Sequence, residues 1–237
     1  HLLHKSKYAH DKLDLKIADV QELNQSCHDG TALISKVSFH LLGLLRDQYC
    51  LLPSGAALGY GCGPLLVSKA PIKAEELVDK TIAIPGKDTT AYLLLKCFCP
   101  EATQIKEMLF SDIMPAVLNG EVDAGLVIHE SRFTYKSLRL ELIRDLGEWW
   151  ESETSLPIPL GGIIAKRELG IDLIKDFNQA IKGWCKINIL HNCRQINAGR
   201  LRLRFKKFIE VTAIKKLLHY HYFNAGFKLF ESSGYHP

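Results

Sequence analysis

Two spacings of apolar residues alternate along the chain, and they predict strands that alternate with helices. Alternating or continuous apolar runs of strand length occur at 13–17, 31–38, 49–55, 63–69, 81–86, 105–110, 122–129, 140–146 and 157–169. Helical spacing or helix-start residues predict helices at 19–30, 39–45, 72–79, 87–98, 111–120, 147–154 and 171–184. This alternation favours an α/β fold with parallel sheets that helices cover on both faces.

Polar residues mark where two of the predicted helices begin. Asp19 precedes the first helix as an N-cap residue, and Asp88, Thr89 or Thr90 can cap the helix in 87–98. The free N–H groups of such a helix start favour a carboxylate or phosphate on a ligand. A cap threonine also has a purely structural interpretation, so spacing alone leaves both interpretations open.

Glycine- and proline-marked crossings near Asp79 and Trp184, together with the density of strands, predict two lobes with a cleft between them. We place the first α/β lobe at 1–80, the second at 81–187, and a separate tail at 188–237. Open α/β sheets bind ligands where a strand end meets a helix start. The strand end 36–38, which runs into a predicted helix, is such a place.

Composition narrows the class of protein. The chain has 237 residues and is 47% hydrophobic, which is enough to form packed cores. The longest uncharged run, 48–68, contains two prolines and four glycines, so it predicts a loop-rich connection and not a membrane helix. Seven cysteines without paired spacing favour a reducing, cytoplasmic location.

Charge is distributed unevenly between the two ends of the chain. Residues 1–181 carry 19 Lys and Arg against 24 Asp and Glu, whereas residues 182–237 carry 11 against 2. The basic tail interleaves aromatic residues with histidines, a pattern that also occurs on RNA-binding surfaces. A charge run is more often a solvated face. We therefore predict no nucleic-acid or membrane partner.

Motifs for several chemistries are absent from the sequence. It contains no Walker loop, dinucleotide glycine fingerprint, nucleophile elbow or zinc signature, and we predict no metal site. His129 ends a predicted buried strand, where open α/β folds place chemistry. From spacing alone it is either a base at a cleft or a hydrogen-bonded strand-end residue. Glu130 or Arg132 would orient the ring or bind an anionic substrate group, respectively.

Five stretches carry more specific patterns: KVSFH (36–40), LLPSGAALGYGCGPLLVSK (51–69), IPGKDTTAYLLLK (84–96), IMPAVLNGEVDAGLVIHESRFTY (113–135) and DLGEWWESETSLPIPLGGIIAKRELG (145–170). In this order they resemble the 1,4-dihydroxy-6-naphthoate synthase family, which acts late in the futalosine route to menaquinone. The match extends from about residue 19 to about residue 181, and IHESRFTY and DLGEWWE are its most specific parts.

The resemblance implies a two-lobed fold like the type II periplasmic binding proteins and a cytoplasmic carbon–carbon lyase. The implied substrate is a small molecule, cyclic dehypoxanthinyl futalosine, and no metal or redox cofactor is implied. His129 matches the family's proposed proton acceptor. The family's substrate-contact positions fall on Lys36, Val37, Ser38, Thr89, Thr90 and Ala91.

Two departures from the family pattern lie at the ends of the chain. The family begins with a strand and a loop like SPCPNDTF, whereas this chain opens HLLHKSKY, so we expect an incomplete first lobe. After about residue 181 the basic tail replaces the helices that nominally complete that lobe. A shift of reading frame would explain the charge reversal, and under this hypothesis the chain is inactive although it retains the predicted base.

Two alternative functions fit the same residues. Chorismate dehydratase is a sister activity of the same pathway on the same kind of fold. A non-catalytic solute-binding protein would use the same two-lobed plan. IHESRFTY and DLGEWWE favour the synthase over chorismate dehydratase, whereas a secretory signal upstream of His1 would favour the solute-binding protein.

Overall fold

The computed structural model describes residues 14–129 and 131–192. All of them belong to the first of the two units into which the chain divides, 1–195. Predictions that fall on Glu130 or on the tail beyond Asn192 lie outside the described residues. The α/β class is confirmed, since helices and strands alternate through the described chain.

The smaller sheet is antiparallel and is organised around one long strand. Its strands are β1 (Ile34–Ser38), β2 (Tyr49–Leu51), β3 (Ala57–Gly59) and β9 (Ile158–Lys166). The strands β1, β2 and β3 all pair antiparallel with β9. The prediction of a parallel sheet is wrong here because β9 comes from the far end of the described chain, and apolar spacing does not identify a strand's partner.

The larger sheet is mixed. It contains β4 (Leu65–Ser68), β5 (Ile82–Ile84), β6 (Ile105–Glu107), β7 (Ala124–Val127) and β8 (Glu141–Asp145), in the order β6-β5-β7-β4-β8. The strand β5 runs parallel to β6 and β7, as predicted, whereas β4 runs antiparallel to β7 and β8. The carboxyl ends of the three parallel strands therefore lie at one edge, where open α/β sheets bind ligands.

All seven predicted helices have a counterpart, but the one at 72–79 is a 3-10 turn, the last continues to Asn192, and a short helix at Ser131–Thr134 was not predicted. They are α1 (Val20–His28), α2 (Phe39–Leu45), α3 (Thr90–Phe98), α4 (Phe110–Asn119), α5 (Ser131–Thr134), α6 (Leu146–Thr154) and α7 (Ile171–Asn192), with 3-10 turns η2 (Ala74–Asp79), η3 (Tyr135–Leu138) and η4 (Arg167–Leu169). The strand expected at 13–17 is wrong: residues 14–17 form no strand, and Leu15 and Ile17 are exposed. An alternating pattern supports a half-buried strand only where one face is covered, and neither of these two side chains is.

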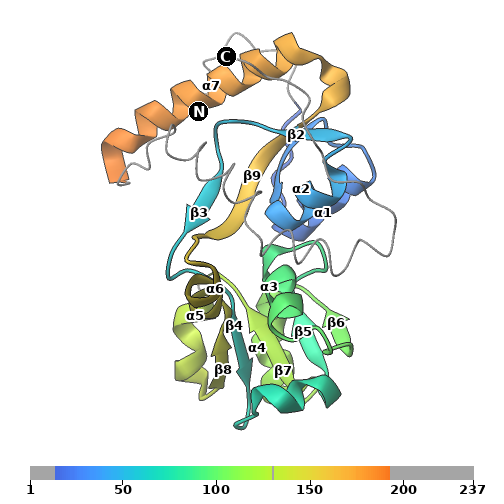
Figure 1. Cartoon of the computed structure of the whole chain (residues 1–237), viewed down its shortest axis with the longest axis vertical. Coiled ribbons are helices and arrows are strands. Elements are labelled where there is room, and N and C mark those ends of the chain that lie inside the picture. Colours follow the sequence, from blue (N-terminus) through green and yellow to red (C-terminus); the bar gives the residue numbers. More distant parts are fainter. Residues whose placement is uncertain (1–13, 130, 193–237) are drawn as a thin grey trace. The chain divides into compact units, whose positions relative to one another are not determined.

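Each sheet has its own apolar core. On the larger sheet, Ile113 and Val117 of α4 pack against Val67 and Ala83, and Figure 1 shows α4 beside β7. On the smaller sheet, Leu41 of α2 belongs to the cluster that contains the strand residues Val37 and Ile164. Apolar stripes on helices and strands thus find complementary faces, as their periodicity predicted.

Sheet membership divides the chain differently from the boundary expected at residue 80. The strand β4 already belongs to the larger sheet, and β9 returns to the smaller one. The chain therefore crosses between the sheets twice, once after β3 and once before β9. The first crossing lies in the glycine-rich segment 59–64 and not near residue 80.

At the first crossing, two glycines lie back to back. A Cβ atom added to Gly63 would stand 2.3 Å from the Cα atom of Gly147, and one added to Gly147 would stand 2.7 Å from that of Gly63. Next to this contact, the Leu146 N–H donates to the carbonyl of Pro64 at 3.0 Å. No side chain fits between these backbones, so the start of α6 is fixed against the start of β4.

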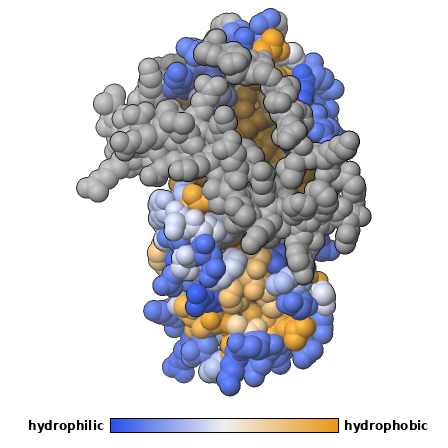
Figure 2. All heavy atoms as spheres, viewed as in Figure 1, coloured by the Kyte–Doolittle hydropathy of each residue, from blue (hydrophilic) through white to orange (hydrophobic). Residues whose placement is uncertain are grey.

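Hydrophilic residues cover much of the described surface visible in Figure 2, and apolar groups interrupt them. Among the helices that the structure describes, none combines the length and apolar character needed to cross a membrane.

We expect Gly63→Ala to destabilise the protein by about 3 kcal/mol, because its methyl group would overlap backbone atoms that cannot rotate away. A thermal unfolding curve should show a melting temperature roughly 6–12 °C lower. Gly43→Ala is the control, since a Cβ at this exposed position on α2 meets nothing within 4 Å. It should stabilise the helix by up to about 1 kcal/mol. Equal melting temperatures for the two variants would contradict the role of the Gly63 contact.

Candidate functional site

His129 lies two residues beyond the end of β7, at the carboxyl edge of the parallel strands. Its φ is 56°, a left-handed conformation that few residues other than glycine adopt. The residue is exposed, and its ring meets that of Phe110 edge to face at a centroid distance of 5.6 Å. Residues with a strained backbone conformation occur more often at functional sites than elsewhere. The left-handed φ therefore supports the interpretation of His129 as a functional residue.

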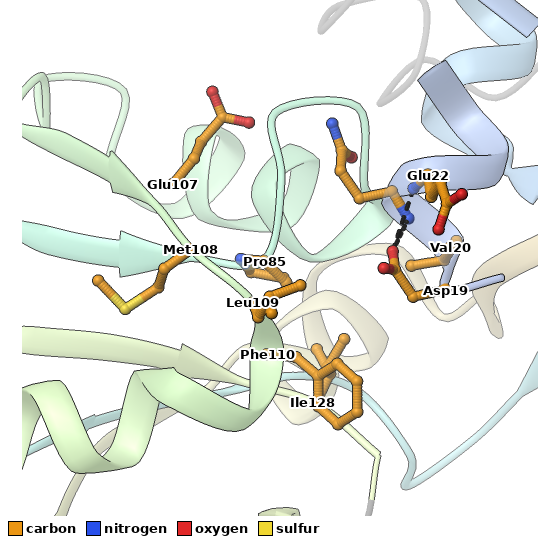
Figure 3. A pocket seen from close by; sticks show the side chains of 10 residues that line it. Asp19, Val20, Glu22, Pro85, Glu107, Met108, Leu109, Phe110 and Ile128 are labelled. Carbon is orange, nitrogen blue, oxygen red and sulfur yellow. Dashed lines mark hydrogen bonds between the residues drawn. The ribbon is translucent and has the colours of Figure 1, made fainter. Parts of the chain in front are cut away.

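Beside His129 is a cavity of about 250 Å³. Ten described residues line it: Asp19, Val20, Gln21, Glu22, Pro85, Glu107, Met108, Leu109, Phe110 and Ile128. They come from the start of α1 and from the carboxyl ends of β5, β6 and β7. Figure 3 shows Phe110 and Ile128 together near the start of α4, with Asp19 and Val20 on the α1 side. The cavity therefore occupies the predicted binding edge of the larger sheet.

Asn24 connects two segments that the sequence predicts as substrate contacts. Its Oδ1 accepts from the backbone N–H of Ser38 at 3.2 Å, and its Nδ2 donates to the carbonyl of Asp88 at 3.4 Å. Asn24 is fully buried. The strand end at Lys36–Ser38 and the loop before α3 are thus brought together by one side chain, which the sequence analysis missed. A polar residue on the buried stripe of α1 was the available signal.

The two threonines at the start of α3 have different partners. Thr89 is the N-cap, since its Oγ1 accepts from the N–H of Tyr92 at 3.2 Å. The Oγ1 of Thr90 instead donates to the carbonyl of Pro159 at 2.8 Å, so it ties α3 to β9. Both residues and Ala91 are buried. Of the three capping candidates, Thr89 is therefore the one that the structure selects.

His28 also holds the loop before α3. The Nε2 of His28 lies 3.0 Å from Oδ2 of Asp88. His40, on α2, lies close by, where burial lowers its pKa although the carboxylate of Asp88 opposes the shift. A neutral imidazole at His40 fits this enclosed position.

The predicted residues thus form two groups. Five of the six predicted contact positions are buried around Asn24 and β9, and only Lys36 is exposed. His129 lies beside the cavity, which none of these six described residues lines. The helix α1 links the groups, because Gln21 lines the cavity and Asn24, one turn later, holds the loop and strand end.

Arg132 does not point to a ligand in this structure. Its Nη2 pairs with Oδ2 of Asp145 at 2.6 Å, and its Nη1 donates to the carbonyl of Gly63. Both charged side chains are mostly buried, and Asp145 also caps α6 through the N–H of Gly147 at 2.9 Å. The predicted anion-binding role of Arg132 is therefore replaced by a structural one, since its guanidinium has protein partners.

Comparisons with known proteins bear on this site. A family model described as menaquinone biosynthesis matches residues 2–195. The 1,4-dihydroxy-6-naphthoate synthase of Thermus thermophilus is 43% identical over 170 residues, and the match covers 72% of this chain. The chain spans only 61% of the length of that relative.

Two solved structures are similar to the described fold. A protein from Archaeoglobus fulgidus superposes with a TM-score of 0.64 and 34% identity, over 90% of this chain and 71% of that one. The substrate-binding protein of an amino acid ABC transporter gives a TM-score of 0.51 at 17% identity, over 75% of each chain. The second similarity shows the fold alone, and it confirms the predicted architecture like that of the periplasmic binding proteins.

We expect Arg132→Met to destabilise the protein by about 2–3 kcal/mol, because it leaves the mostly buried carboxylate of Asp145 without its charged partner. Chemical denaturation measures this directly. Arg144→Met is the matched control on β8, since Arg144 is exposed, and its effect should stay within about 0.5 kcal/mol. If both variants lost the same stability, the ion pair would not hold this region together.

Proposed function

The chain belongs to the menaquinone biosynthesis family, and we propose that it converts cyclic dehypoxanthinyl futalosine into 1,4-dihydroxy-6-naphthoate as a carbon–carbon lyase. The 43% identity to a relative that carries this enzyme's name supports the proposal. The same identity favours the synthase over chorismate dehydratase and over a solute-binding protein. The observation that carries the proposal is His129, which stands in a left-handed turn beside a cavity at the carboxyl edge of the sheet.

His129 is the proposed proton acceptor. Histidine is the side chain that most often acts as a general base, and a base must reach the proton that it removes. The turn after β7 places the ring at the surface, against Phe110, which itself lines the cavity. A substrate held in the cavity would thus lie next to the imidazole.

The strand end 36–38 and the start of α3 are the proposed contacts for the rest of the substrate. The helix start offers backbone N–H groups, which favour an anionic group such as a carboxylate. Asn24 keeps this helix start beside the strand end. Lys36, the exposed member of the group, adds a positive charge on the same strand.

The proposal also covers the two lobes of the chain and the compartment in which it acts. We assign one lobe to each sheet, so that the chain passes from the first lobe to the second after β3 and returns with β9. The reaction is proposed to take place in the cytoplasm. The five cysteines with described side chains are free thiols, which suits a reducing compartment.

The direct test is incubation of the 237-residue chain with cyclic dehypoxanthinyl futalosine, followed by mass analysis of the product. Formation of 1,4-dihydroxy-6-naphthoate is expected. A parallel incubation with chorismate identifies the sister activity. A folded chain that yields no naphthoate would overturn the proposed reaction.

We expect His129→Asn to lower kcat at least 100-fold while substrate binding persists, since general base catalysis contributes about 10²–10⁴-fold. Asparagine tolerates the left-handed backbone, so the turn should keep its shape. Arg139→Asn is the control, because Arg139 is exposed and has the same φ of 56°. Steady-state kinetics should show near-normal turnover for the control. Near-normal turnover of His129→Asn would exclude this histidine as the base.

A further inference from the structure

Gln21 lines the cavity but makes no side-chain hydrogen bond to any residue that the structure describes. Its Oε1 is buried and without a partner. Buried amide groups are nearly always hydrogen-bonded, because an unpaired acceptor loses its water without compensation. Asn24, the next polar residue on this helix face, does have partners, namely Ser38 and Asp88. Gln21 therefore has hydrogen-bonding capacity left over at the cavity.

Gly86 makes room for this side chain. A Cβ atom at Gly86 would stand 2.1 Å from Oε1 of Gln21 and 2.4 Å from its Cδ. The residue has a φ of 149°, in the region that favours glycine. The loop that leads to α3 thus leaves space for the amide of Gln21. The amide of this cavity-lining residue therefore lies against the loop that precedes the predicted substrate contacts of α3.

The remaining lining indicates what kind of group the cavity accepts. Six of the ten described lining residues are apolar, and three are carboxylic acids. None of the ten is a cation, so the lining disfavours a carboxylate or phosphate. With about 250 Å³, the cavity is smaller than the pockets of roughly 300–1,000 Å³ that hold whole drug-sized ligands. It suits one uncharged part of a larger substrate.

We infer that Gln21 is a substrate-binding residue whose amide hydrogen-bonds an uncharged, hydroxyl-bearing part of the substrate in this cavity. A hydroxyl group both donates and accepts, so it can satisfy either end of an amide. The anionic part of the substrate then lies at the start of α3, away from the three carboxylates. This inference rests on the proposed function and adds a specificity-determining residue to it.

The test compares Gln21→Met with the wild-type chain in steady-state kinetics with cyclic dehypoxanthinyl futalosine. Methionine keeps the length and removes the hydrogen bond, so KM should rise roughly tenfold, as for the loss of one hydrogen bond, while kcat changes less than about twofold. The melting temperature should not fall, because no described protein partner is lost. Gln25→Met is the matched control on the exposed side of α1, where Gln25 binds only Asp29, and its KM should match the wild type.

A second substitution tests the charge of the bound group. Gln21→Glu retains acceptor atoms for a hydroxyl, so its KM should rise less than that of Gln21→Met. A larger rise for the glutamate variant would indicate an anionic group in the cavity and would overturn the inference. If the chain is active and Gln21→Met leaves KM unchanged, the inference about Gln21 is overturned while the proposed function stands. A folded wild-type chain without any turnover would overturn the proposed function, and the inference with it.

Discussion

The ion pair between Arg132 and Asp145, together with the hydrogen bond from Arg132 to Gly63, joins three different segments of the chain. Arg132 follows β7, Asp145 ends β8, and the guanidinium also binds the carbonyl of Gly63 at the first crossing between the sheets. The N–H of Arg132 donates to the carbonyl of His129 at 3.3 Å. The mostly buried guanidinium therefore ties the first crossing to Asp145, which caps α6, and the backbone N–H of the same residue closes the turn that presents His129. Removing the cation would destabilise this whole region, because it would leave the mostly buried carboxylate of Asp145 without its charged partner.

A second constraint acts at α1. This helix places Gln21 in the cavity and Asn24 against the strand end and the loop before α3, because residues three apart share one helix face. The cavity beside His129 and the predicted contact positions are thus held at a fixed spacing by a single helix. Under the proposed function, the substrate occupies both regions, with its uncharged part near Gln21 and its anionic part near the helix start.

Local sequence predicted many of the residues at the site, but it did not predict their hydrogen-bond and ion-pair partners. The capping pattern before α1 and the threonines before α3 predicted helix starts that the structure has. Spacing did not separate Thr89, which caps, from Thr90, which binds Pro159, because that carbonyl lies 69 residues away. Arg132 was interpreted as an anion-binding residue for the same reason: its partners Gly63 and Asp145 are distant or on another strand.

The sequence by itself determined the helices, most strands, the α/β class and the position of His129 at a strand end, since these follow from apolar periodicity and local capping. Only the tertiary structure decided that β9 pairs antiparallel with three earlier strands, that Gly63 lies against Gly147, and that Gln21 reaches the cavity. Pairing and close approach depend on which surfaces meet in space. A residue's neighbours in the chain carry little information about those surfaces.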